Sequence, residues 1–219
     1  MHLIVKIIHY ILFMIKRLTF CLTLSIAGFF LLADPFQRNL EPFNQLSVKQ
    51  GTKVTLIKGN EYKAKLNILR GDLEDVLSEV KNGQLTLRIR LNVRYKYVEV
   101  NVALTYINLD LINVLSIGMV EGSDQLKCET LGIDVSSLGF VTMNSKFNSF
   151  ETGISSAGHV ELRGRVGDQV LDLSSGAYYK GFRIISQRTL VDASSGGLVE
   201  FQGCPVSLKK RLRSSGSVS

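Results

Sequence analysis

The 219-residue chain is 45% hydrophobic and holds nineteen glycines and three prolines, which fits one folded core and excludes collagen-like and disordered chains. Its formal charge of +7 does not indicate a nucleic-acid partner. Three of the excess cations lie in the first 33 residues and four lie between 209 and 213, so the body between them is neutral. No basic stripe with interleaved aromatic residues runs along that body.

The first 33 residues form an apolar leader, in which two blocks, 3–15 and 18–33, are separated by Lys16 and Arg17. The second block is short for a membrane span and is typical of a secretory signal, with Met14 as the expected start. Leu31 stands where a signal-peptide cleavage site prefers a small residue, so an uncleaved membrane anchor stays open. We therefore expect an extracytoplasmic protein, in the periplasm, associated with the outer membrane or secreted. Its membrane contact would be only through the leader.

A linker is expected over 34–42 and a single domain over 43–219. Alternating apolar residues and turn signals predict strands over 45–48, 53–57 and 62–69. The next segment, GDLEDVLSEVKNG, predicts one short helix that begins after Asp72 and ends at Asn82–Gly83. Two further strands are predicted over 84–91 and 96–104.

From residue 116 onward, a serine followed by glycine and apolar residues recurs every 19 to 21 residues. The repeated segments read SIGMV, SLGFV, SAGHV, SGAYY, SGGLV and SGSVS, beginning at Ser116, Ser137, Ser156, Ser175, Ser195 and Ser215. A period this regular is the signature of a solenoid, in which each repeat buries its apolar face against its neighbours. About 20 residues is too short for two-helix repeats, and no leucine-rich frame is present.

Apolar residues alternate with polar ones on both sides of each Ser/Gly turn, which predicts strand, turn and strand. At about 3.3 Å per residue, one repeat makes a perimeter of ~66 Å, enough for roughly three short strands. Gly139 and Gly158 are expected to hold the positive-φ corner. The predicted fold is all-β, a parallel β-helix with one coil per repeat.

The order of several segments resembles the head GIN domain family of auto-transporter adhesins. These segments are GDLEDVLSEVKNGQLTLRI, YVEVNVALTYINLDLINVLSIG, the Ser-x-Gly coils, FQGCP and a last SSGS, and together they span about residues 43–219. The resemblance implies an extracytoplasmic right-handed β-helix, a bacterial host with two membranes and an adhesive role. It implies no catalytic or ligand-binding residues.

Carboxylates form the candidate enzymatic site. Asp134, Asp172 and Asp192 each lie three residues before a repeat serine, in one outward column that Gly153 interrupts. Asp172 and Asp192 would be about 4.8 Å apart on adjacent coils. Such a pair can act as acid and base on a glycan, or can bind a hard cation such as calcium. No arginine or lysine is expected in this column, so a solvated, structural role is the alternative.

Aromatic residues form the candidate binding site. The positions three after the serines read Phe140, His159, Tyr178 and Leu198, an outward row able to stack on sugar rings or on a partner. The serines have no base within reach, because His159 points outward, so nucleophilic catalysis is not expected. No metal-ligand spacing and no phosphate-binding motif occur, and no cofactor is expected. The sequence thus favours a non-enzymatic envelope protein that binds a surface glycan or an envelope protein. An inert scaffold and a glycan-cleaving β-helix enzyme are the alternatives.

The last repeat breaks the alternation, since Arg211 and Arg213 fall at inward positions. The strand must slip by one residue, bend away at Pro205 or end the stack against solvent; we favour the last. No disulfide is expected, because Cys21 leaves with the leader. Cys128 and Cys204 would lie ~19 Å apart, beyond the reach of a bridge.

Overall fold

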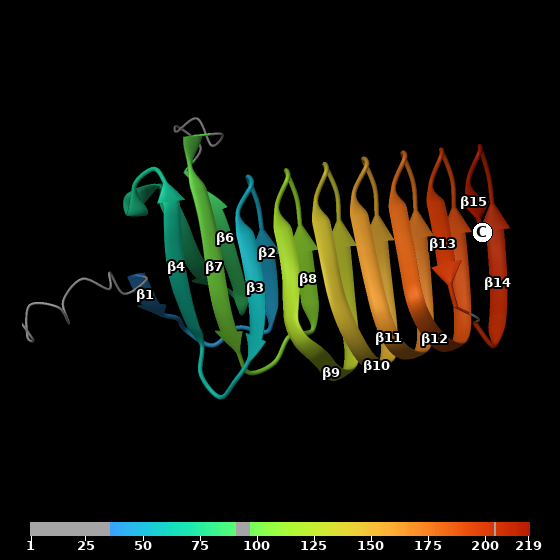
Figure 1. The fold of residues 1–219 in the computed structure, drawn as a ribbon, viewed down its shortest axis with the longest axis horizontal. Coiled ribbons are helices and arrows are strands. Elements are labelled where there is room, and N and C mark those ends of the chain that lie inside the picture. Colours follow the sequence, from blue (N-terminus) through green and yellow to red (C-terminus); the bar gives the residue numbers. More distant parts are fainter. Residues whose placement is uncertain (1–35, 91–96, 204) are drawn as a thin grey trace, which may run out of the picture. The chain divides into compact units, whose positions relative to one another are not determined.

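The computed structural model describes residues 36–90, 97–203 and 205–219. Phe36–Ser219 forms one compact unit, an all-β solenoid (Figure 1). The segment expected as a linker contributes its first strand. The strands are β1 Phe36–Asn39, β2 Gln45–Val48, β3 Lys53–Lys58, β4 Lys63–Arg70, β5 Val76–Lys81, β6 Gln84–Ile89, β7 Glu99–Tyr106, β8 Leu111–Val114, β9 Met119–Val135, β10 Phe140–Ile154, β11 His159–Leu173, β12 Tyr178–Ala193, β13 Leu198–Gln202, β14 Ser207–Leu212 and β15 Ser217–Val218.

The solenoid has two faces that enclose the core between them. The first face runs β1-β4-β7-β3 and continues through the first halves of β9 to β12 to β13 and β15. The second face runs β5-β6-β2-β8 and continues through the second halves of the same long strands to β14. Pairing is parallel from β2, β3 and β8 onward, whereas β4 pairs antiparallel with β1 and β7.

Each long strand of 15 to 17 residues makes almost a whole coil. It leaves a tight turn along the first face, bends, and returns along the second face to the next tight turn (Figure 1). The period of about 20 residues predicted this stacking. The coil nevertheless has two long sides and one bend, rather than three short strands.

In the tight turns, glycine is required for close backbone packing and not, as predicted, for a positive φ angle. Ser137 and Leu138 take the positive φ angles, 52° and 62°, and Gly139 follows them and donates its N–H to the Ser136 carbonyl at 3.0 Å. A Cβ on Gly139 would lie 2.7 Å from the Val114 carbonyl oxygen of the previous coil. Glycine is therefore required because two backbones approach closely, and the prediction that Gly139 and Gly158 hold positive φ is wrong.

The predicted helix is also wrong. Only Leu73–Asp75 forms a single 3-10 turn, and the rest of the segment is β5, which pairs antiparallel with β6. Asn82 and Gly83 have φ of 50° and 75°, the two left-handed positions of a hairpin turn that Asn-Gly favours. The described residues contain no α-helix, and so none that could cross a membrane.

The core follows the alternation read from the repeats. Ile112, Ile133, Thr152, Leu171 and Val191 stack in one inward column, and each is at most 3% exposed. The one polar member, Thr152, donates its hydroxyl to the Ile133 carbonyl at 2.6 Å.

A polar cluster lies inside the coils of β11 and β12. Gln169 accepts from the Tyr179 hydroxyl at 3.0 Å and donates to Ser186 at 3.1 Å and Thr189 at 2.8 Å. All four side chains are buried. Because every member is hydrogen-bonded within the cluster, it is a satisfied part of the core rather than a site.

The last strand shows a register slip, which corrects the favoured expectation that the stack simply ends. β14 pairs parallel with β12, with Val191 opposite Lys210 and Ala193 opposite Leu212. The turn begins one residue earlier than predicted, because Ser214 and Ser215 take the positive φ angles. Arg211 and Arg213 thereby leave the inward positions, and Lys210 takes one.

Candidate functional site

The aromatic row lies on the outer side of the first face. Phe140 pairs with His159, His159 with Tyr178 and Tyr178 with Leu198, so the four residues occupy consecutive coils. The ring centroids of Phe140 and His159 are 4.8 Å apart, and those of His159 and Tyr178 are 4.7 Å apart. The first pair is tilted, with 57° between the ring planes, and the second is edge to face, with 80°. Leu198 is 38% exposed at the end of the row.

His159 is held in this row by apolar packing. Its Nε2 atom is buried and has no hydrogen-bond partner among the described residues. Burial lowers the pKa of His159, Lys180 adds to that effect, and Glu161 opposes it. The imidazole is therefore neutral near pH 7 and serves as a ring in the stack, not as a base for a serine nucleophile.

Charged residues flank the row on the same face. Glu161, Lys180 and Glu200 are paired in register along the next outward positions. The Tyr178 hydroxyl donates to Glu200, and this hydrogen bond, with burial, raises the pKa of Tyr178 to about 12. Arg163 bonds Glu161 at 2.7 Å, and its guanidinium lies 4.5 Å from the centre of the Phe182 ring. Rings bordered by hydrogen-bonding groups can contact both the apolar face and the hydroxyls of a saccharide.

The carboxylate column lies on the opposite face. The structure places Asp134, Gly153, Asp172 and Asp192 in adjacent coils. Asp192, however, is bonded by Arg213 at 2.9 Å and lies 3.6 Å from Arg211, which follows it in the column. The expectation that no arginine stands there is wrong, because it assumed the unslipped register.

The ion pairs of Asp192 weaken the case for an acid/base pair in the carboxylate column. Asp172 and Asp192 are not two equivalent free carboxylates, since the arginines neutralise Asp192. Asp134 and Asp172 border a groove of about 360 Å³ over Gly153. A Cβ at Gly153 would lie 2.9 Å from an Asp134 carboxylate oxygen, so the Asp134 side chain lies over the glycine. The described residues hold no group of three metal-ligating side chains.

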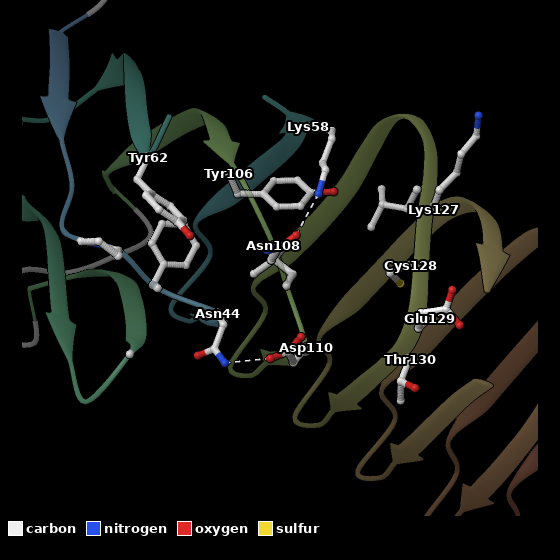
Figure 2. A pocket seen from close by; sticks show the side chains of 15 residues that line it. Asn44, Lys58, Tyr62, Tyr106, Asn108, Asp110, Lys127, Cys128, Glu129 and Thr130 are labelled. Carbon is white, nitrogen blue, oxygen red and sulfur yellow. Dashed lines mark hydrogen bonds between the residues drawn. The ribbon is translucent and has the colours of Figure 1, made fainter. Parts of the chain in front are cut away.

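A larger cavity, of about 620 Å³, lies where β3, β7 and β8 meet the bend of β9. Its walls come from the segments before β2 and β4, the ends of β3 and β7, the β7–β8 connection and the middle of β9 (Figure 2). Phe43 and Tyr62 form one aromatic wall, with ring centroids 5.0 Å apart, and Tyr106 forms another.

Hydrogen bonds fix the polar groups of the cavity. The Asn44 side chain donates to Asp110 at 2.7 Å, and the Asp110 N–H donates to the Asn44 carbonyl at 2.8 Å (Figure 2). The Lys58 ammonium donates to the Ile107 carbonyl and to Asn108 at 3.2 Å. It also lies 5.5 Å from the centre of the Tyr106 ring. These groups are thus ordered before any ligand arrives.

Two titratable groups of the cavity, Tyr106 and Cys128, are neutral near pH 7. Burial raises the pKa of Tyr106 to about 12 and, against the opposing charge of Lys58, raises the pKa of Cys128 to about 11. Cys128 is a free thiol, and Cys204 lies outside the described residues, as do Cys21 and the leader. The Glu129 carboxylate accepts from Asn148 of the next coil.

Sequence reasoning missed this cavity. Its polar residues lie in separate segments between positions 44 and 130, and none belongs to a repeated motif. The only signal was the irregular spacing before residue 116, where the Ser-x-Gly period is absent.

The described residues form a β-solenoid that carries the aromatic row on one outer face and the carboxylate column on the other. A family model described as "Putative auto-transporter adhesin, head GIN domain" matches residues 42–219. The chain belongs to this family. Among curated proteins, no relative is matched.

Solved structures share the fold. A "putative adhesin" from Bacteroides fragilis matches with a TM-score of 0.64 at 14% identity, over 84% of this chain and 94% of that one. A "putative adhesin" from Parabacteroides merdae matches with a TM-score of 0.56 at 10% identity, over 84% and 93%. A "putative lipid binding protein" from Parabacteroides distasonis matches with a TM-score of 0.52 at 12% identity, over 85% and 96%. At these identities the likeness shows the fold alone.

Proposed function

We propose that the protein is a non-enzymatic binding protein of the bacterial cell envelope, exported by its apolar leader, that binds a surface glycan along the aromatic row. The observation that carries this proposal is the uninterrupted row of half-buried rings over consecutive coils. A flat row that repeats about every 4.8 Å suits an extended, repetitive ligand. Membership in a family named for adhesins supports binding at the cell surface.

The rigidity of the row favours binding. Each ring is held by its neighbours and by the strand beneath, so little side-chain entropy is lost when a ligand contacts it. Glu161, Lys180 and Glu200 supply hydrogen-bonding groups beside the rings. The inert-scaffold alternative gives no role to this row of half-buried rings. The glycan-cleaving alternative is weakened by the arginine pairs of Asp192.

The proposal is tested by glycan-array binding of the full chain and of a Phe140→Thr/Tyr178→Thr variant. Threonine keeps the strand preference while it removes both rings. Glycan binding that falls at least about tenfold in the variant supports the proposal. A matched control is Leu190→Thr on the opposite face, where the side chain is 47% exposed.

Two results would overturn the proposal. Binding of no glycan by the unmodified chain would favour the scaffold. Release of new reducing ends from a polysaccharide, abolished by Asp172→Asn, would establish the enzyme instead.

A further inference from the structure

We infer that the cavity between β7 and the bend of β9 is a second binding site, which takes a single neutral pyranose ring. This site is distinct from the aromatic row, and the inference does not rest on the function proposed for that row. Its volume of about 620 Å³ lies within the range of about 300–1,000 Å³ that ligand clefts occupy.

The cavity exists because the coil before β9 consists of two separate strands, β3 and β8, with no bend among the described residues that joins them. β3 pairs with β9 only up to Gly122, and β8 pairs with it only from Gly132. Between these residues, β9 is paired with β10 on one side and has no strand on the other within the described part of the chain. Backbone donors and acceptors of this edge therefore face the cavity and remain available to the hydroxyls of a ligand.

The charges of the lining select a neutral ligand. Lys58 and Lys127 are balanced by Asp110 and Glu129, so the cavity favours neither an anion nor a cation. Lys58, Asp110 and Glu129 are each already bonded within the protein, and Lys127 extends away from the other labelled side chains (Figure 2). Their remaining donors and acceptors can hydrogen-bond the hydroxyl groups of a neutral ligand.

The shape and chemistry of the walls select a sugar ring. Tyr62 offers a partly exposed ring to the C–H face of a pyranose, whereas Tyr106 is only 3% exposed and lines the cavity without presenting an open ring face. The Asn44–Asp110 pair offers adjacent groups to neighbouring hydroxyls. That pair is held by two hydrogen bonds, so it is ordered in advance. An acyl chain offers no hydrogen-bonding groups to this pair or to the open edge of β9, which disfavours a lipid tail.

Saturation-transfer NMR on the full chain, in a detergent that contains no sugar, tests the inference with four probes. The probes are methyl glucoside, methyl galactoside, methyl mannoside and N-acetylglucosamine. We expect at least one to bind and to slow alkylation of Cys128, followed by mass spectrometry of the peptide that contains it. Asn44→Ala and Asp110→Ala, both at exposed positions, should each weaken binding at least about tenfold.

Matched controls separate this site from the aromatic row. Asp134→Ala removes an exposed carboxylate outside the cavity and should leave both monosaccharide binding and the protection of Cys128 unchanged. The inference is wrong if none of the four probes binds, or if binding survives both cavity variants. It is equally wrong if Tyr178→Thr, rather than the cavity variants, abolishes it. Protection of Cys128 by a fatty acid but by no sugar would assign the cavity to lipid.

Discussion

His159 links pH to the stability of the aromatic row. Its pKa is lowered by burial, so the unfolded chain, in which histidine titrates near 6.5, binds the proton more readily than the folded chain. The neutral ring contributes its full stability above about pH 6.5 and loses it as pH falls toward the lowered folded-state value. Glu161 and Lys180 act on this group in opposite directions.

We therefore expect the melting temperature of the protein to fall more between about pH 7.5 and about pH 5.5 than that of a His159→Phe variant. Phenylalanine keeps a ring between Phe140 and Tyr178 and removes the titration. The comparison cancels the other histidines, His2 and His9, which lie outside the described residues. Parallel pH profiles for the two proteins would show that His159 does not titrate with folding.

Cys128 gives a second pH-dependent measurement, in the cavity. Because burial raises its pKa from 9.0 to about 11, the reactive thiolate at pH 8 should be roughly 100-fold scarcer than for an unperturbed thiol. Alkylation by iodoacetamide should be slower by that factor and should keep rising up to about pH 11. Asp110→Asn removes a charge that raises this pKa, and should make the reaction faster. A rate that levels off near pH 9 would contradict the described burial.

At the scale of the turn, glycine is required for space rather than for its backbone angle. A Cβ at Gly158 would lie 2.7 Å from the Val135 carbonyl oxygen, whereas Gly176, with φ of 70°, has no atom within 4 Å. Gly158→Ala should lower the free energy of unfolding by about 1–3 kcal/mol. Gly176→Asn should cost less than about 1 kcal/mol, since asparagine tolerates positive φ. Urea unfolding of both variants checks this order, and the reverse order would contradict the turn geometry.

The sequence predicted the turns but not their conformation, for a physical reason. Period and alternation depend on many residues and survive local irregularity, so β2 and the approximate bounds of β3, β4 and β6 were confirmed. The conformation of a single turn depends on contacts with the neighbouring coil. The sequence of one repeat carries no information about these contacts. Val76, Leu77 and Val80 fit a helical face as well as a strand, and only the pairing of β5 with β6 decides between them.

The two sides of a strand should respond very differently to charge. Val160 and Leu173 are 0% exposed, while Asp172 is exposed. Val160→Glu places an unpaired charge in the core and should destabilise the unit by at least about 3 kcal/mol. Asp172→Lys, on the outside, should change the free energy of unfolding by less than about 0.5 kcal/mol. Equal shifts in the melting temperatures of the two variants would refute the assigned faces.

At the scale of the whole unit, extra residues in one coil shift the positions of all later turns. Counting residues from the first repeat therefore predicts the last turns less accurately. β9 carries extra residues between Glu121 and Gln125, opposite Thr142–Asn144 of β10, and β12 carries one extra residue between Phe182 and Ile185, opposite Arg163–Arg165 of β11. A bulge absorbs a residue without disturbing the core. The repeat interval can therefore vary between coils, and the position of the last turn was predicted one residue too late. The cavity could not be predicted either. It forms where, in the part of the chain that the structure describes, the coil before β9 lacks the bend that would pair with residues 123–131 of β9.

The slipped register places a charge where the stack is open. Lys210 continues the inward column of Leu171 and Val191, with Leu208 and Leu212 at the neighbouring inward positions of β14. Leu208 and Leu212 are 39% and 40% exposed, and β14 is paired only with β12 among the described residues. An inward-pointing charge on an edge strand is a known means of preventing edge-to-edge association. Lys210 would have to be desolvated if a second solenoid stacked on this end.

Lys210→Val should therefore promote end-to-end association of the protein. The substitution makes the inward row of β14 fully apolar, so a second molecule could continue the stack by pairing with that edge. Static light scattering should show a concentration-dependent rise in mass for this variant, while the unfolding midpoint at low concentration stays the same or rises. Lys209→Val is the matched control, because Lys209 pairs with Leu190 on the outer side, where a charge does not enter the stacking surface. Lys210→Val that stays monomeric at every concentration, or equal association of the two variants, would show that Lys210 does not protect this end.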